Sequence, residues 1–166
     1  MQVLPHMRYI GSMNIFILDK NTRRCAQYHN DKHVVKMILE TAQLLCAVHH
    51  NLGSKDVPYK STHKNHPCAI WARENISNYY WLLDLGFELC REYTYRYSRQ
   101  HKSELVLNWC LGNTPNLPDE ELSAFALAMP DDCKQDCAIQ SYRKYYIMHK
   151  RDISKWTNRE VPKWFY

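Results

Sequence analysis

The sequence predicts a mainly α-helical, single-domain protein with two long packed helices and a short N-terminal extended segment. Apolar residues recur at helical spacing over two long stretches, with capping residues, glycine or proline at their ends. The 166 residues suit one domain that buries its core without disulfides. Neither an internal repeat nor a low-complexity segment interrupts this pattern.

The first twelve residues differ in character from the rest of the chain. A Gly-Ser pair directly before Met13 is typical of a cloning remnant, so we expect residues 1–12 to be an extension and 13–166 the helical domain. A native upstream start is the competing interpretation. The apolar run 14–18 is predicted to be extended in the core, and 19–22 to be a polar turn.

The first long helix is predicted from Asp31 to His50, with Asn30 or Asp31 as its cap and Gly53 just past its end. Apolar residues at helical spacing form one face: Val34, Met37, Ile38, Leu45 and Val48. The other face is a polar stripe: His29, His33, Lys36 and Glu40.

A loop from Gly53 to His66 separates this helix from a second, for which Pro67 is a suitable first residue. The remaining predicted segments are the second helix 67–97, a short helix 104–111 ended by Gly112, a loop with a weak helix over 113–130, and a final helix 135–150.

The polar stripe carries possible chemistry. Seven residues are close to two helical turns, so His33 and Glu40 project from the same side, with Lys36 between them. An imidazole, an amine and a carboxylate in line are suited to proton transfer and charge stabilisation. The alternative is a solvated helix face with an ordinary ion pair between Lys36 and Glu40.

The polar loop from Thr62 to Pro67 opens the second helix, whose first amides have free N–H groups. Such a position favours an anion or phosphate, and Lys64 adds a full charge. We therefore expect Lys64, Asn65, His66 and Arg73 to contact nucleic acid.

Four imidazoles offer an alternative metal site: His29, His33, His63 and His66. A spacing of four residues between His29 and His33 would let two rings on one helix share an ion. We expect no cofactor, with a divalent metal at this histidine cluster as the alternative.

The positive charge is concentrated at the C-terminal end. From Arg143 to Tyr166 seven Lys or Arg stand against Asp152 and Glu160, a net +5, and aromatic residues alternate with them. This pattern suits a phosphate backbone with exposed bases, although a solvated helix face over core aromatics would look the same. The residues expected to contact DNA are Arg143, Lys144, Lys150 and Arg151.

Composition and missing motifs narrow the classes of protein to which the chain can belong. The seven cysteines stand singly, as expected for core thiols in a reducing compartment, and only Cys133 and Cys137 lie close together. Neither a bilayer-length apolar run nor a secretion signal is visible, so we expect a cytoplasmic protein (host cytoplasm if viral) with no membrane or obvious protein partner. Kinase, dehydrogenase and serine-hydrolase motifs are missing.

Asp31-Lys32-His33 followed by Glu40 resembles the pyrimidine-dimer DNA glycosylase/AP lyase family of T-even phages (their endonuclease V). The run 14–18 is similar to the segment that carries the family's N-terminal amine into its site. Asn65-His66-Pro67 and the basic-aromatic segment 142–146 also resemble parts of these small, helical, single-domain proteins. The resemblance covers roughly 14–97 plus that segment.

The resemblance implies a mechanism. An amine, that of Met13 or of Lys32 or Lys36, would attack C1′ of a damaged or modified nucleotide, release the base and leave a Schiff base. Glu40 would stabilise the cationic sugar and take part in strand cleavage by β-elimination, and His33 would orient phosphate or Glu40. The gap left by the extruded nucleotide would be filled by Trp71, Tyr79, Tyr80 or Trp156.

The chain also departs from the family pattern. The family's nucleophile is the amine of a Thr exposed by Met removal, whereas Asn14 is too large for easy removal of Met13. The arginines that follow the family's Glu are missing, since 41–48 is apolar. Two other classes stay open: a metal-dependent nuclease or hydrolase, and a non-enzymatic binder of nucleic acid or nucleotides such as a viral accessory protein.

Overall fold

A computed structural model describes residues 13–166, and these residues are helical without a strand. The predicted extension 1–12 lies outside the described residues. The elements are α1 (Thr22–Tyr28), α2 (Asp31–Asn51), α3 (Pro67–Glu74), α4 (Ile76–Tyr97), α5 (Glu104–Gly112) and α6 (Ala138–His149), with short 3-10 helices η1 (Asp131–Cys133), η2 (Arg151–Ile153) and η3 (Lys163–Phe165). The predicted mainly α class is confirmed. A bilayer-spanning helix is not found within residues 13–166.

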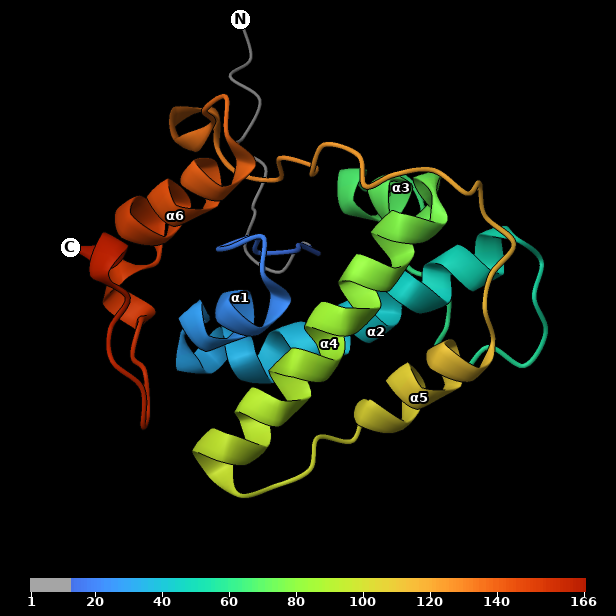
Figure 1. The fold of residues 1–166 in the computed structure, drawn as a ribbon, viewed down its shortest axis with the longest axis horizontal. Helices are drawn as coiled ribbons and strands as arrows, with labels where there is room; N and C mark the ends of the chain where they lie inside the picture. Colours follow the sequence, from blue (N-terminus) through green and yellow to red (C-terminus); the bar gives the residue numbers. More distant parts are fainter. Residues whose placement is uncertain (1–12) are drawn as a thin grey trace, which may run out of the picture.

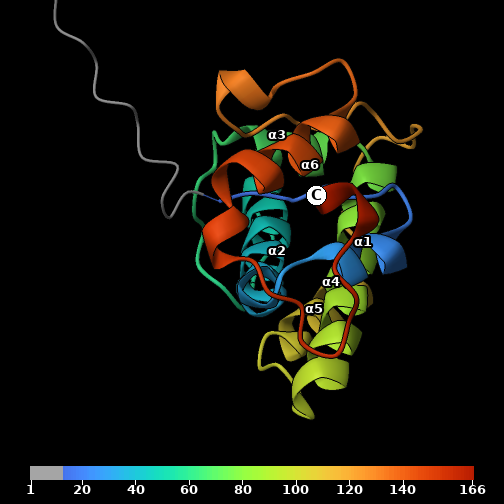
Figure 2. The ribbon, with the colours of Figure 1, turned by 90° about the vertical axis from the view of Figure 1, so that its left-hand side faces the viewer.

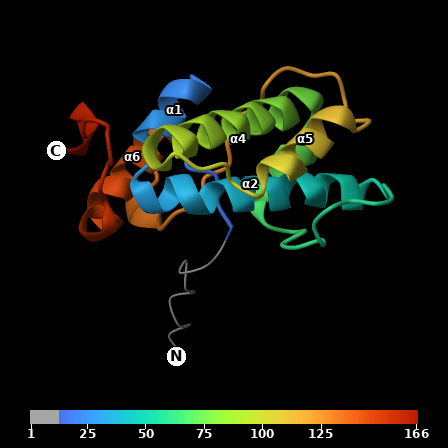
Figure 3. The ribbon, with the colours of Figure 1, turned by 90° about the horizontal axis from the view of Figure 1, so that it is seen from below.

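The long helices α2 and α4 form the centre of the molecule (Figures 1 and 3). Both α1 and α5 pack against α4, and α3 packs against both long helices. Gly86 lies where α4 meets its neighbours: a Cβ there would come within 3.0 Å of Thr41 on α2 and of Leu107 on α5. A hydrogen at this position is what lets the three helices approach so closely.

Helix α2 matches its prediction closely. The Asn30 side chain accepts a hydrogen bond from the backbone N–H of His33, and the helix ends shortly before Gly53, whose φ is +75°. All five predicted apolar residues are buried: Val34, Met37, Ile38, Leu45 and Val48. The predicted packing of this helix against the second long helix is also confirmed.

The predicted helix 67–97 is wrong as a single element, because the chain breaks at Asn75. Asn75 is fully extended (φ −157°, ψ 168°), and its side chain accepts from the N–H of Asn78 to begin α4. Its amide also donates to the Glu121 carbonyl. A good N-cap with a tertiary partner outweighs helix continuity here.

The structure differs from the predicted elements in three smaller respects. The predicted polar turn leads directly into α1, which Asn21 caps by accepting from the N–H of Arg24. The weak helix expected over 113–130 does not form: this segment runs along the molecule past α3 to α6 (Figure 1) and hydrogen-bonds to the start of α4. The last helix begins at Ala138 rather than 135.

The segment 14–18 is extended and buried, as predicted. Helix α6 lies along it (Figure 2), with the Phe16 ring stacked on Tyr145 at 5.9 Å between centroids. The Tyr142 hydroxyl donates to Asn14, and the Arg143 Nε donates to the Leu18 carbonyl at 2.9 Å. Helix α6 thus holds the segment 14–18 against α2.

Candidate functional site

Glu40 lies mid-way along α2 and is only 5% exposed. The backbone N–H of Asn14 lies near enough to favour its ionised form, and the Lys36 Nζ lies 3.8 Å from its Oε1. Burial raises the pKa of Glu40 to about 7, against the opposing effect of Lys36, Lys150 and the Asn14 N–H. A carboxyl group with such a pKa exchanges its proton at neutral pH, as general acid–base chemistry requires.

His33 lies two turns earlier on α2 and is also buried. Its Nδ1 is 2.6 Å from the Tyr146 hydroxyl, and its ring is stacked on Phe16 at 4.2 Å between centroids. Burial, with the nearby charges of His29, Lys150 and Lys36, lowers the pKa of His33 well below its usual value. The imidazole is therefore neutral and fixed in orientation.

Lys150 brings a second amine to Glu40 from the C-terminal end of α6. The side chain is half-buried, with its Nζ 5.0 Å from the centre of the Tyr145 ring. Burial is the main cause that lowers the pKa of Lys150, helped by the charge of Lys36 and opposed by Glu40. From the sequence, Lys150 is expected only to contact DNA, because no spacing relates position 150 to position 40.

His29 does not belong to the helical stripe. It is the C-cap of α1, with ψ of 135°, and the extended Asn30 separates it from α2. The predicted four-residue helical spacing from His29 to His33 is therefore wrong. The His29 Nδ1 lies 2.7 Å from the Cys25 carbonyl, its buried Nε2 has no hydrogen-bond partner, and burial lowers its pKa to about 4.

The four histidines of the predicted metal site are not gathered around one point. Within residues 13–166, no three of them bring ligand atoms within 4.8 Å of one another. His66 instead caps α3, its Nδ1 accepting from the N–H of Cys68 at 3.0 Å. Its ring lies 6.5 Å from that of His63.

The polar loop before α3 presents its predicted residues unevenly. Lys64 and Asn65 are exposed, so their side chains are open to a phosphate. Arg73 is engaged with the loop itself, donating from Nη1 to the Lys64 carbonyl at 2.7 Å. Contact of this loop with DNA stays a prediction.

The basic C-terminal residues divide into two groups. Arg143 is an internal anchor, paired with Asp19 and stacked over Tyr28 and Trp164. Arg151 is exposed but donates to the Phe165 carbonyl. Lys144 and Lys150 form no ion pair within the described part of the chain, so they present charge more freely than Arg143.

Three of the four aromatics expected to fill the gap of an extruded nucleotide are inaccessible. Trp71 and Tyr79 are core residues, and Trp156 is buried with its indole N–H donated to the Tyr28 carbonyl. Tyr80 alone among the four is exposed, at 40%. Large aromatics at helical spacing belong to the core here.

A family model described as pyrimidine dimer DNA glycosylase matches residues 13–105. The chain belongs to this family. The sequence resemblance is thereby confirmed, and the chain is a DNA repair glycosylase in the general sense, with DNA as its class of substrate. No curated protein and no solved structure matched the chain.

The family match begins at Met13, the residue before the amide near Glu40. It includes His33, Lys36 and Glu40, but ends before α6. Lys150 and Tyr146, which complete the surroundings of Glu40 and His33, come from outside the match in this glycosylase.

Proposed function

We propose that the protein is a DNA glycosylase with AP lyase activity, in which Glu40 is the catalytic carboxylate. The observation that carries the proposal is the position of Glu40: buried, near the Asn14 amide and 3.8 Å from the Lys36 amine. A carboxylate and an amine close together are the pair that Schiff-base chemistry on a sugar needs. Both groups lie within the segment that the family model matches.

In the proposed reaction, the amine nitrogen attacks C1′ of the damaged nucleotide as the bond from C1′ to the base breaks. The base leaves with the bonding electrons and takes up a proton. Positive charge develops on the sugar, and ionised Glu40 stabilises it. The amine nitrogen then loses a proton and the C1′–O4′ bond breaks, with O4′ taking up a proton, which leaves a Schiff base with the opened sugar. Glu40, acting as the base, removes a C2′ proton, and the C3′–O bond breaks to expel the 3′ phosphate, which cuts the strand.

Of the three amines expected from the sequence, Lys32 is exposed and is not among the charges that act on Glu40, which leaves two candidates for the attack. The α-amine of Met13, in a chain that begins there, lies one residue before the amide near Glu40. The Lys36 Nζ is the other, since its side chain is half exposed to an approaching sugar. Neutral His33 orients Glu40 or a phosphate from the same face of α2. Lys150 contributes positive charge that favours the ionised form of Glu40.

The test is reductive trapping on abasic DNA with borohydride. The 166-residue chain and a form that begins at Met13 are compared, together with Lys36→Arg in both. An adduct formed only by the shorter chain assigns the amine to Met13. An adduct formed by both chains and lost in Lys36→Arg assigns it to Lys36. Lys32→Arg, an exposed lysine one turn earlier, is the matched control and keeps the adduct in either case.

The absence of any trapped adduct with either chain would contradict the lyase proposal. DNA binding without an adduct would then favour the non-enzymatic binder. For the metal-dependent alternative, the separation of the four histidines removes the geometric support. A repair activity of this kind also agrees with the predicted cytoplasmic location.

A further inference from the structure

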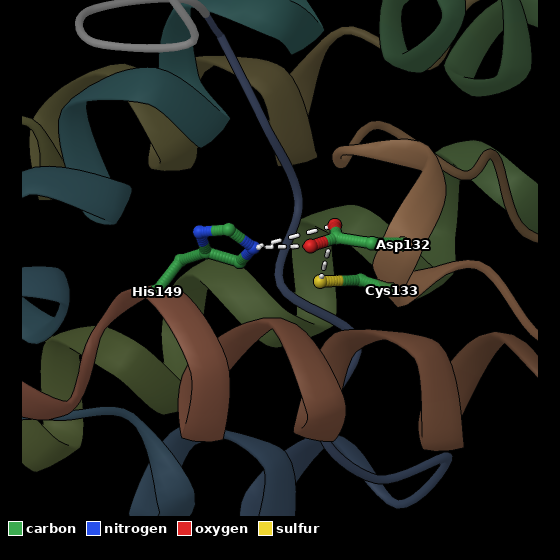
Figure 4. Close-up of side chains that lie close together, drawn as sticks. All are labelled: Asp132, Cys133 and His149. Atoms are coloured by element: carbon green, nitrogen blue, oxygen red, sulfur yellow. Dashed lines mark hydrogen bonds and ion pairs between the residues drawn. The ribbon is translucent and has the colours of Figure 1, made fainter.

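Three potential metal ligands lie together at the junction of η1 and α6 (Figure 4). Asp132 and Cys133 come from η1, and His149 is the last residue of α6. Within residues 13–166, these three side chains form the group of potential ligands in which each has one ligand atom within 4.8 Å of those of the other two.

The separations from the Asp132 carboxylate to the other two ligand atoms match the edges of a zinc tetrahedron. The His149 Nε2 lies 3.2 and 3.3 Å from the two carboxylate oxygens of Asp132, and the Cys133 Sγ lies 3.4 Å from Oδ1. With bonds of about 2.0 Å from zinc to N and O and about 2.3 Å to S, tetrahedral ligands are separated by about 3.3 Å for N and O and about 3.5 Å for S and O. Asp132 therefore already lies at a tetrahedral separation from both other ligands, and the His149 Nε2 and the Cys133 Sγ lie within 4.8 Å of each other.

The ligand set selects the class of ion. A thiolate with an imidazole and one carboxylate favours Zn²⁺, whereas Mg²⁺ and Ca²⁺ require oxygen ligands. The sulfur side of the group is buried, while the side chains of His149 and Asp132 are 38% and 51% exposed. An ion can therefore enter from solvent, and water can take the fourth position.

We propose that Asp132, Cys133 and His149 form a zinc site that fastens η1 to the end of α6. The ion replaces two weak contacts, the ion pair of Asp132 with His149 and the bond of the Cys133 thiol to Asp132, by three coordinate bonds. Because Lys150 directly follows His149, the site also fixes the point from which Lys150 reaches towards Glu40. The proposal does not depend on the proposed function.

The experiment titrates chelator-treated full-length protein with zinc alone, read by calorimetry, and with Co²⁺, read by absorbance. We expect one zinc per chain and a near-ultraviolet charge-transfer band for a bond between cobalt and sulfur. Cys133→Ser should lose the band, and Cys133→Ser and His149→Gln should each weaken zinc binding at least tenfold. Cys137→Ser changes an exposed thiol four residues away and should leave both signals intact.

Circular dichroism shows whether each variant is folded. Should Cys133→Ser fail to fold because the residue is buried, His149→Gln still decides the question, since its side chain is partly exposed. Wild-type protein that binds no stoichiometric zinc overturns the proposal. So does zinc binding that persists unchanged in His149→Gln, or that is lost in Cys137→Ser.

Discussion

Glu40 is surrounded by groups that act on its proton in opposite directions. Burial favours the neutral acid, while Lys36, Lys150 and the Asn14 amide favour the carboxylate, and the outcome is a pKa of about 7. The side chains of Lys36 and Lys150 are partly exposed to solvent. A phosphate that binds them would therefore reduce their stabilisation of the Glu40 carboxylate. Substrate binding and the protonation of Glu40 are thereby linked.

Glu40→Gln tests the catalytic role directly. The amide keeps the size and hydrogen-bonding capacity of the side chain but removes the charge that stabilises a sugar cation. We expect base release in single turnovers to fall by roughly two orders of magnitude or more, the usual scale for removing one preorganised electrostatic group. DNA affinity should change little, and the unfolding midpoint at neutral pH should stay the same or rise, because the variant avoids ionising a buried carboxyl group. A loss of activity matched by an equal loss of stability would instead identify Glu40 as a structural partner of Lys36.

The close crossing of α4 with α2 and α5 depends on the absence of a side chain at Gly86. Gly86→Ala places a Cβ 3.0 Å from both Thr41 and Leu107, which are themselves buried. Alanine gains up to about 1 kcal/mol in helix propensity, but overpacking costs about 1–3 kcal/mol. We therefore expect a net loss of about 1 kcal/mol in the free energy of unfolding, measured in urea.

Gly112→Ala is the control for this substitution. Gly112 is also helical, but a Cβ there meets nothing within 4 Å. It should be neutral or stabilising. Equal effects at the two positions would mean that the close approach at Gly86 does not limit the packing.

The helices whose ends carry local signals could be predicted from the sequence. Asn30, Gly53, Pro67 and Gly112 mark ends by their own conformational preferences, and the structure agrees at each. The break at Asn75 was missed because its deciding partner, the Glu121 carbonyl, lies 46 residues away. A local pattern carries no information about such a partner.

The candidate site likewise contains residues that could be predicted from the sequence and residues that could not. His33, Lys36 and Glu40 follow from helical periodicity, since one helix carries all three. Lys150 and Tyr146 could not be placed there, because only the packing of α6 along the N-terminal segment brings them near. For the same reason, His29 was misassigned: the chain turns between it and α2.

For the whole molecule, the buried titratable groups predict how stability depends on pH. The pKa of His29 falls from 6.5 to about 4, and that of His33 is also lowered, so their contributions are complete above pH 6.5 and are lost as the pH falls towards 4. Glu40 has the opposite effect on stability. Its pKa is raised from 4.5 to about 7, so its contribution to the free energy of unfolding is complete below pH 4.5 and is lost as the pH rises through 7. The pKa of His49, a third buried histidine, is lowered as well, so with three histidines against one acid we expect stability to fall on acidification from pH 7.5 to 5.

His29→Gln should reduce that fall by about 2 kcal/mol, the linkage value for a shift of this size at pH 5. Urea unfolding at both pH values measures it. The comparison uses the change between the two pH values, so a general loss of stability in the variant does not affect it. His63→Gln replaces an exposed ring and should keep the wild-type dependence. Identical pH profiles for wild type and His29→Gln would contradict the assignment.

Helix α6 packs along the segment 14–18, and this contact between distant parts of the chain matters while the protein is being made. A nascent chain whose first 105 residues have left the ribosome already contains His33, Lys36 and Glu40. It still lacks α6, so nothing presses the segment 14–18 onto α2, and neither Tyr146 nor Lys150 is present. The surroundings of Glu40 and His33 are complete only after α6 has been synthesised. Under the proposed function, a chain that stops before α6 would therefore lack a complete site.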